Sequence, residues 1–439
     1  MTHPGVPAQA GRIRPAERDA IIASLRAGMV PRIGQQHIQV GRAAEVQSAA
    51  LDIARIADGG AGCRFVIGEY GSGKTFFLHL VRSIALQKRL VTVHADLSPD
   101  RRLHAGSGQA RGLYAELMRN LATRARPDGG ALASVVERFV TKALSDSEAA
   151  HGDPQTSITS QLAELTDLTG GYDFATVIRA YWHGYDSGDE GLREAAVRWL
   201  RGEFTSRVDA RAALGVRTIV DDTTFYDHLK LMARFVRLAG FSGLLVCLDE
   251  MVNLYKLSSA AARNANYEQV LRIVNDCAQG GAEHLGFLFG GTPEFLLDPR
   301  RGLFSYPALA SRLAPNRFAS AERLDHSGPV LRLGNLTPED VFVLLTKLRH
   351  VYAAGDPARH LVPDEALTAY MAHCAGRLGD AYFRTPRETI RGFLDLLALL
   401  DQHAGLHWSA LINTVDLTGG PDSPDAPSTD DDELTSFRL

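Results

Sequence analysis

The sequence has little cysteine, and the few that it has are not arranged as a site. Its 439 residues include four cysteines, Cys63, Cys247, Cys277 and Cys374, and no two of them form a CxxC pair. The spacing therefore indicates neither a zinc site nor a disulfide framework. Cys63 and Cys247 lie in apolar runs, where we expect a cysteine to be a small buried hydrophobe.

Long hydrophobic runs and an excess of positive charge are also missing. The mostly apolar stretch 393–400 is too short to span a bilayer, and residues 1–19 have no apolar core of the signal-peptide kind. The sequence thus predicts a cytoplasmic protein with no membrane partner. Its formal net charge of −4 does not indicate a nucleic-acid binder, although a local basic face is compatible with that total.

What the sequence does have is enough apolar residues for large cores and an alternation of short apolar runs with helical patterns. Hydrophobic residues make up 45% and charged residues 22%, as in soluble globular proteins of two or three domains. Apolar runs predict five strands, at 63–67, 90–95, 243–248, 285–289 and 330–333. Helical spacing predicts helices at 15–26, 43–56, 76–88, 132–144, 173–182, 194–204, 223–238 and 338–352. Apolar strands separated by helices predict an α/β fold with a parallel sheet.

The predicted elements divide the chain into segments. We expect an N-terminal helical segment (1–40), an α/β domain in two parts (41–99 and 241–335), a helical subdomain inserted between them (100–240), a helical lid (336–405) and a disordered acidic tail (419–439). The insertion is interpreted as helical because structureless loops of that length are rare. The tail is rich in Pro, Ser and Asp, and a docking peptide is the alternative interpretation.

One stretch carries a specific chemical signal. Gly68, Gly73, Lys74 and Thr75 fit the pattern G-x-x-x-x-G-K-[ST], and a predicted strand precedes them while a predicted helix follows. Glycines let the backbone wrap round a phosphate, the helix start favours an anion, Lys74 would reach the β- and γ-phosphates, and Thr75 would ligate Mg²⁺. The alternative is a glycine-rich turn with a solvated lysine. The predicted nucleotide-binding residues of this stretch are Gly68, Glu69, Tyr70, Gly71, Ser72, Gly73, Lys74, Thr75 and Phe76.

Acidic and polar residues follow two later strands. Asp249 and Glu250 come directly after the apolar run 243–248. Asp249 is predicted to hold Mg²⁺ and Glu250 to deprotonate the attacking water, whereas the alternative for such acids is helix capping. Thr292 follows the strand 285–289 and is predicted to contact the water and the γ-phosphate, unless it is only a turn residue. An acid pair favours an ATPase over a GTP switch, and no N-K-x-D motif is present.

Arginines are needed where charge develops on a transferred phosphoryl group. The stretch SRLAPNRF offers Arg312 and Arg317, and RTPRETIRGFL offers Arg384 and Arg387. We predict Arg387 as the lid arginine and Arg312 as a finger that acts on a neighbouring subunit of a homo-oligomer, with Arg317 as the alternative finger. Without such a role each would be an ordinary surface residue.

The order of these motifs resembles that of AAA+-type P-loop ATPases, in the branch that includes origin-recognition initiators. The segment HIQVGRAAEV, with Gly41 and Arg42, resembles the part of those proteins that lies over the adenine, and the helices after LGNLTP resemble their lid. The resemblance implies ATP and Mg²⁺ as ligands. No room is left after Arg387 for the winged-helix domain by which initiators bind DNA.

A more specific resemblance is to the ATP-binding protein family BrxD of BREX bacteriophage-exclusion systems. It extends over almost all of residues 28–400 and is carried by VGRAAE, FVIGEYGSGKTFFLHLVR, VTVHADLSPDRRLHA, QARGLYAELMRNLATRARPDGGAL, LLVCLDEMVNLYKL, LGFLFGGTPEFL and RTPRETIRGFL. It implies a prokaryotic ATPase that works with other phage-defence proteins, such as a methyltransferase, a phosphatase-like protein and a helicase.

Two further sequence features and three candidate functions complete the predictions. The run from Arg101 to Arg126 is rich in arginine, so it could contact DNA or pair with acids of the inserted helices or of a neighbouring subunit. Tyr181 and Trp182 are predicted to be core residues and not a base-stacking platform.

The chain is predicted to be an oligomeric ATPase that acts as a motor or loader. The competing function is a slowly hydrolysing switch that assembles a defence complex, and a kinase is the weakest alternative.

Overall fold

The computed structural model describes residues 12–320, 323, 325–378, 386–403 and 405–412. They belong to two compact units: Gly41–Asn335 forms one, and Met1–Val40 together with Leu336–Leu439 forms the other. The predicted tail 419–439 and Arg384 lie outside the described residues. In the described part of the chain, no helix has both the length and the apolar character needed to cross a membrane.

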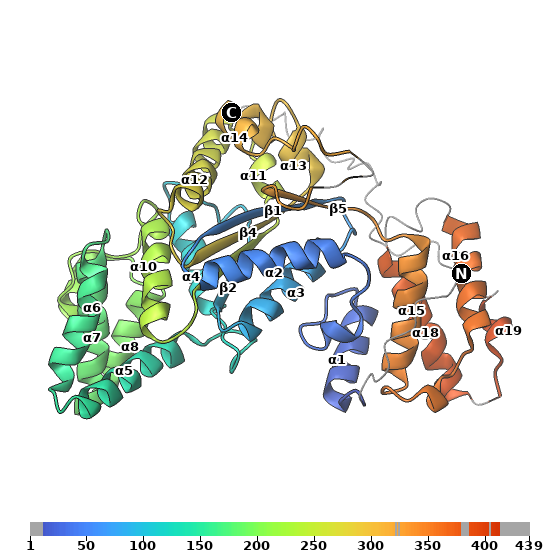
Figure 1. Ribbon diagram of the computed structural model, residues 1–439, viewed down its shortest axis with the longest axis horizontal. Coiled ribbons are helices and arrows are strands. Elements are labelled where there is room, and N and C mark those ends of the chain that lie inside the picture. Colours follow the sequence, from blue (N-terminus) through green and yellow to red (C-terminus); the bar gives the residue numbers. More distant parts are fainter. Residues whose placement is uncertain (1–11, 321–322, 324, 379–385, 404, 413–439) are drawn as a thin grey trace, which may run out of the picture. The chain divides into compact units, whose positions relative to one another are not determined.

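The first unit is built on a five-stranded parallel sheet, so the predicted α/β class and all five predicted strands are confirmed (Figure 1). The strand order is β2-β3-β4-β1-β5. The strands are β1 (Gly62–Gly68), β2 (Val91–Asp96), β3 (Leu244–Asp249), β4 (Leu285–Gly291) and β5 (Val330–Leu333). Because all five are parallel, their carboxyl ends meet at one edge of the sheet and their amino ends at the other.

Both faces of the sheet are covered, which explains why its strands are apolar along their whole length. Successive side chains of a strand point to opposite faces. On β1, Phe65 and Ile67 therefore enter one hydrophobic core and Val66 enters the other. The smaller core packs α2 and α3 on the sheet, and both helices lie across the strands in Figure 1.

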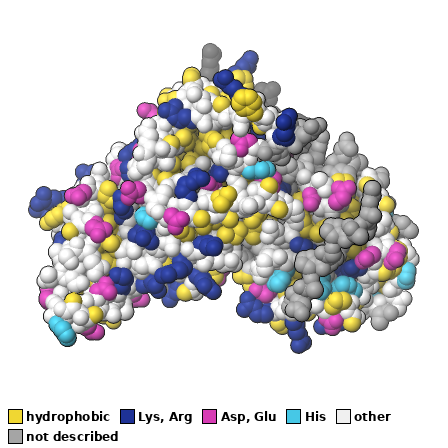
Figure 2. Space-filling view, in the orientation of Figure 1, with side chains coloured by type: hydrophobic (Ala, Val, Ile, Leu, Met, Phe, Trp, Pro, Cys, Tyr) yellow, Lys and Arg dark blue, Asp and Glu magenta, His cyan; other side chains and the backbone are white. Residues whose placement is uncertain are grey.

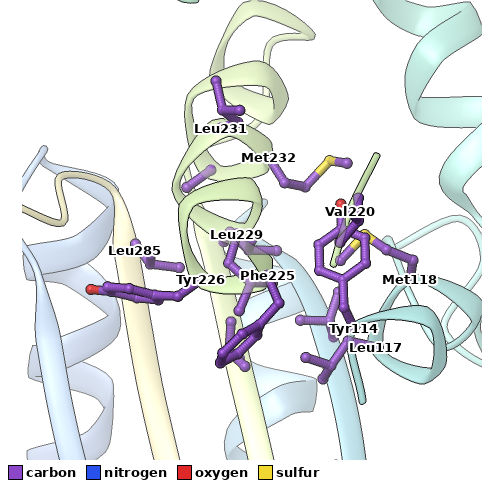
Figure 3. Close-up of a cluster of buried hydrophobic side chains, with 14 of the residues drawn as sticks. Tyr114, Leu117, Met118, Val220, Phe225, Tyr226, Leu229, Leu231, Met232 and Leu285 are labelled. Atoms are coloured by element: carbon purple, nitrogen blue, oxygen red, sulfur yellow. The ribbon is translucent and has the colours of Figure 1, made fainter. Parts of the chain in front are cut away.

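The larger core joins the opposite face of the sheet to the helices between β2 and β3. Figure 3 shows part of this core, where Tyr226 of α10 (Phe225–Leu238) points toward Leu285 of β4, and Tyr114, Leu117 and Met118 of α4 (Gln109–Arg119) lie on the other side of α10. Fully burying one such side chain stabilises a fold by about 1.5–3 kcal/mol. The insertion is therefore held on the sheet by an extensive apolar interface within one compact unit.

The helices predicted for this unit are present, but several of them begin or end at other residues than the sequence pattern predicts. The helix predicted at 194–204 is in fact α8 (Glu190–Leu200), because Gly202 adopts a φ of 68° that ends the helix earlier. The helices of the first unit are α2 (Ala43–Ala57), α3 (Lys74–Gln87), α4 (Gln109–Arg119), α5 (Leu132–Ala149), α6 (Pro154–Thr166), α7 (Gly171–Ser187), α8, α9 (Arg207–Leu214), α10 (Phe225–Leu238), α11 (Val252–Tyr255), α12 (Ala260–Gln279), α13 (Pro293–Leu297) and α14 (Pro307–Arg312).

The second unit combines the two ends of the chain. Its helices are α1 (Pro15–Arg26), α15 (Pro338–Tyr352), α16 (Asp364–Leu378), α18 (Pro386–Gln402) and α19 (Trp408–Ile412). The predicted helices 15–26 and 338–352 are confirmed as α1 and α15, and Thr337 and Asp340 form a capping box that starts α15. Arg26 on α1 pairs with Asp395 on α18 at 2.9 Å, so the N-terminal segment packs with the C-terminal helices.

Candidate functional site

The glycine-rich loop lies between β1 and α3, as its pattern requires. Gly71 and Gly73 have φ values of 82° and 84°, a left-handed conformation that glycine adopts without steric cost. Gly68 has a different reason to be glycine. A Cβ on it would lie 2.4 Å from the Ser72 Oγ and 2.8 Å from the Leu333 carbonyl oxygen. The loop thus combines a tight turn with close backbone packing, and it ends at the N-terminus of a 14-residue helix.

Lys74 is the first residue of α3, and its side chain folds back over the loop. Its Nζ donates to the carbonyl oxygens of Gly68 and Glu69, both at 2.8 Å. Partial burial lowers the pKa of Lys74, and the negative charges of Asp249 and Glu250 oppose that shift. The ammonium is therefore held in the concavity of the loop beside two carboxylates.

A hydrogen bond joins the loop to the acid pair. The Thr75 Oγ1 donates to Asp249 Oδ2 at 2.8 Å, although the two residues are 174 positions apart in sequence. The other oxygen of Asp249 accepts from the backbone N–H of Glu250 at 2.8 Å, and Glu250 has a left-handed φ of 56°. Gly290 on the neighbouring strand makes room for this carboxylate, since a Cβ there would lie 2.3 Å from Asp249 Oδ1.

A third acid, which our sequence analysis did not single out, lies at the same edge. Asp96 ends β2 and pairs in register with Asp249. Burial and the charge of Asp249 raise the pKa of Asp96, although its side chain reaches the surface. Burial, Asp249 and Asp96 together raise the pKa of Glu250. Asp96 could have been found from sequence, because it follows its predicted strand as directly as Asp249 follows its own.

The donor set at this edge suits a hard divalent cation. The Thr75 hydroxyl lies within hydrogen-bond distance of the Asp249 carboxylate, and the carboxylates of Asp249 and Glu250 lie near the Lys74 ammonium. Mg²⁺ typically takes one or two protein oxygens and completes its octahedron with phosphate oxygens and water. In the described part of the chain, no group of three His, Cys, Asp or Glu side chains could hold a metal ion.

Thr292 directly follows β4, the strand between β1 and β3. Its Oγ1 is buried and makes no hydrogen bond to another described residue, and it does not cap α13. A buried hydroxyl without a partner costs about 1–3 kcal/mol. The geometry is that of a polar group available to a ligand or a water molecule.

Gly41 and Arg42 precede α2, and both have positive φ values, 59° and 57°. The Arg42 Nη2 donates to the carbonyl oxygens of Ser72 in the loop and of Gly334 after β5, the latter at 3.1 Å. Arg42 therefore connects the glycine-rich loop to the end of β5. Our sequence analysis assigned it only to the adenine and did not anticipate this contact.

The remaining residues of the loop differ in exposure. Glu69 and Tyr70 are exposed, and the exposed fraction of Tyr70 is 67%. Phe76, in the first turn of α3, is half-buried, and Ser72 is buried. Tyr70 is thus the one large apolar ring of the stretch 68–75 that faces solvent.

The structure does not bring the predicted arginines to the acids. Arg312, at the end of α14, donates to Asn275 Oδ1 at 2.5 Å and to the Ala308 carbonyl at 2.9 Å. Arg317 is exposed. Among the described residues, neither arginine pairs with Asp249 or Glu250. Arg387 lies in the second unit, where its side chain packs against Gly28.

The arginine-rich run 101–126 is partly neutralised within the chain. Arg101 and Arg119 pair with Glu116 at 3.6 and 3.0 Å, and Arg119 also lies 3.9 Å from Glu203. The interpretation of this run as pairing with acids of the inserted helices therefore applies to these arginines. The prediction that Tyr181 and Trp182 are core residues is confirmed, since they are only 2% and 8% exposed.

Comparison with known proteins agrees with the nucleotide-binding interpretation. A family model described as "BREX system ATP-binding protein BrxC/D" matches residues 13–416, which include every site residue discussed above. No curated protein matches the chain.

Proposed function

Because the chain belongs to the BREX system ATP-binding protein BrxC/D family, we propose that it is a Mg²⁺-dependent, AAA+-like P-loop ATPase that hydrolyses ATP at the carboxyl edge of its sheet. The family consists of ATP-binding proteins of a phage-defence system. Hydrolysis, the metal and the oligomeric state are our proposal. The strand order, with β4 between the loop-bearing β1 and the acid-bearing β3, is compatible with a P-loop NTPase.

One observation carries the proposal: the hydrogen bond between Thr75 Oγ1 and Asp249 Oδ2. It joins a phosphate-binding pattern and an acid pair that are unrelated in sequence position. A glycine-rich turn without a ligand would have no need of a carboxylate from a distant strand. In a P-loop NTPase the same two oxygens flank the cation.

Each side chain then has a defined task. Lys74 exchanges the carbonyls of Gly68 and Glu69 for β- and γ-phosphate oxygens, which are stronger acceptors because they are charged. Thr75 and Asp249 would hold Mg²⁺, which neutralises phosphate charge when it is bound. Glu250 accepts the proton of the attacking water, and a raised pKa brings its carboxylate closer to the basicity that this task requires. The free hydroxyl of Thr292 orients the water or the γ-phosphate.

The arginines complete the site from elsewhere. We propose that Arg387 acts from the helical lid and that Arg312 acts on the ATP of a neighbouring subunit. This assignment is supported by the exposure of Arg312 and by its separation from the acids of its own chain. Gly41 and Arg42 remain the proposed adenine-side contact. The protein would act in the cytoplasm with other defence proteins, either as a motor or loader or as a slow ATP-dependent switch.

Two substitutions test the site. Lys74→Ala should weaken ATP binding about a hundredfold, because an ammonium no longer faces the phosphates. Glu250→Gln should bind ATP-Mg²⁺ as the wild type does but fail to hydrolyse it. Calorimetry and phosphate release measure the two effects. Lys88→Ala is the matched control, since Lys88 is exposed and follows the other end of α3. Normal hydrolysis by Glu250→Gln would refute the assignment of the base.

A mixing experiment tests the finger. Arg312→Ala and Glu250→Gln should each be inactive alone, but a mixture should regain part of the activity. The Arg312→Ala subunit still has its base and would receive an intact finger from the Glu250→Gln subunit. The mass of Glu250→Gln with and without ATP-Mg²⁺ reports assembly directly. Turnover measured with DNA and with partner proteins separates the motor, which they should stimulate, from the switch, which should retain nucleotide.

A further inference from the structure

The amino edge of the sheet, opposite the proposed ATP site, has a concentration of positive charge. Three arginines from three elements converge on one turn, residues 239–241, between α10 and β3. Arg89 Nη2 donates to the Gly240 carbonyl at 2.9 Å, Arg138 Nε to the Ala239 carbonyl at 2.9 Å, and Arg237 Nη1 to the Phe241 carbonyl at 2.8 Å. We call these three residues the amino-edge arginine cluster. Figure 2 shows dark-blue side chains gathered at the lower centre of the view, in the region that α3, α5 and α10 occupy in Figure 1.

No acid neutralises the cluster. None of Arg89, Arg138 and Arg237 forms a salt bridge with any residue that the structure describes. Other basic residues of α5 and α10, in contrast, do pair with acids. Asp146 pairs with Lys142 on α5, and Glu283 pairs with Arg234 on α10.

The fold alone gives a weak reason for this arrangement. The three carbonyls follow the C-terminus of α10, and a cation there gains about 0.3–1 kcal/mol from the helix dipole. One arginine would be enough to cap such an end, whereas three like charges repel one another. Each guanidinium has five N–H donors and uses one of them in the bonds to this turn. All three side chains are exposed, so the remaining donors are accessible to a ligand.

The chemistry of the cluster fits phosphodiesters. Arginine binds phosphate oxygens with two parallel N–H bonds, and an array of arginines matches a polyanion with regularly spaced charges. The Arg138 guanidinium lies over the ring of Phe241, the aromatic residue of this turn. The distance from Arg138 Cζ to the centroid of the Phe241 ring is 5.1 Å. This ring is therefore not an open platform for stacking a base. A surface of this kind contacts the backbone and not the base edges.

We propose that the amino-edge arginine cluster binds the phosphate backbone of a nucleic acid, without sequence preference. The cluster consists of other residues than the arginine-rich run 101–126, in which Glu116 pairs with Arg101 and Arg119 and Glu203 lies beside Arg119. It lies at the opposite end of the parallel strands from Asp249, so nucleic acid and ATP would bind at opposite edges of one sheet. The proposal does not depend on hydrolysis.

The test is the binding of full-length protein to a fluorescently labelled short DNA duplex and to the corresponding single strand, followed by anisotropy between about 50 and 200 mM salt. The triple substitution Arg89→Gln, Arg138→Gln and Arg237→Gln keeps an N–H donor at each position but removes the charge. We expect affinity at low salt to fall at least about tenfold, and the slope of log K against log salt to fall by about 0.9 for each lost phosphate contact on a duplex.

Two further variants make the result specific. Arg207→Gln, Arg211→Gln and Arg217→Gln remove the same charge from exposed positions in and just after α9 and should bind as the wild type does. Arg89→Lys, Arg138→Lys and Arg237→Lys keep the charge and should retain most of the binding, even if the Gln variant is unstable. Thermal melting and ATP binding of each variant report whether its fold is intact.

Several outcomes would overturn the proposal. One is unchanged binding by the folded Gln variant, and another is an equal loss in the α9 control. A third is capture of polyglutamate but of neither DNA form, which would assign the surface to an acidic protein segment. Binding of the duplex alone or of the single strand alone would support the proposal and identify the form that is bound.

Discussion

The two edges of the sheet carry charges of opposite sign, and the charged groups have different hydrogen-bond partners at each edge. At the carboxyl edge, Asp249 and Glu250 lie near Lys74, Asp96 lies beside Asp249, and the side chains of Thr75 and Asp249 bond directly to each other. At the amino edge, the arginine cluster bonds only to backbone carbonyls of one turn. Each edge thus has an excess of one sign of charge that neighbouring residues do not fully neutralise. Under our two proposals, each edge would bind a ligand of opposite charge: a metal cation with its nucleotide at the carboxyl edge, and a polyanion at the amino edge.

The largest expected effect comes from removing one acid of the carboxyl edge. Glu250→Gln should slow ATP hydrolysis about 10²- to 10⁴-fold, as is typical when a general base is lost, while ATP binding persists. Phosphate release under saturating ATP measures the change. Glu268→Gln, at an exposed position on α12, is the matched control.

Glu250→Gln should also be more stable than the wild type at alkaline pH. The pKa of Glu250 is raised in the folded protein, so its ionised form is disfavoured there. A group of this kind contributes most stability below its unfolded pKa, and the contribution is lost as pH rises through the folded pKa. Glu250→Gln should therefore melt above the wild type at pH 8, but with it at about pH 4, where the wild-type carboxyl is largely protonated. If Glu250→Gln melts below the wild type at pH 8, the ionised Glu250 carboxylate does not destabilise the folded protein, contrary to this prediction.

The next largest effect is expected for Gly290→Ala, which tests how closely the residues around Asp249 are packed. Gly290→Ala places a Cβ 2.3 Å from Asp249 Oδ1 and 2.9 Å from Leu78 Cδ1, so the carboxylate must move away from Thr75. We expect a loss of about 1–3 kcal/mol in the free energy of unfolding, together with weaker ATP-Mg²⁺ binding. Urea denaturation and calorimetry measure the two changes. Gly106→Ala is the control, since a Cβ there meets nothing within 4 Å. Equal behaviour of the two variants would show that the room beside Asp249 is not needed.

The smallest effect concerns Asp96. Asp96→Asn removes one of the charges that raise the pKa of Glu250. The acid limb of the pH profile of hydrolysis should therefore shift to lower pH, by less than about one unit, with little change in the plateau. Asp100→Asn, at an exposed position four residues further along, should leave the profile in place. A shift to higher pH would mean that Asp96 acts on Glu250 otherwise than through its charge.

Much of the first unit was readable from sequence because its signals are local. The apolar runs gave the five strands, and the pattern from Gly68 to Thr75 placed a turn between a strand and a helix. The end of α8 was misplaced because the helical pattern continues past Gly202, whose left-handed backbone ends the helix. Asp96 was overlooked although it directly follows its predicted strand, because its place beside Asp249 depends on how β2 and β3 pair.

The sequence by itself determined which segments are strands and where the chain can turn tightly between a strand and a helix, because apolar runs and glycines act on their immediate neighbours. Only the tertiary structure decided which charged and polar groups pair with one another. Arg119 meets Glu203, Thr75 meets Asp249, and Arg89, Arg138 and Arg237 meet no acid in the described part of the chain. Electrostatic pairing depends on distance in space, and for these residues the folding of remote segments sets that distance.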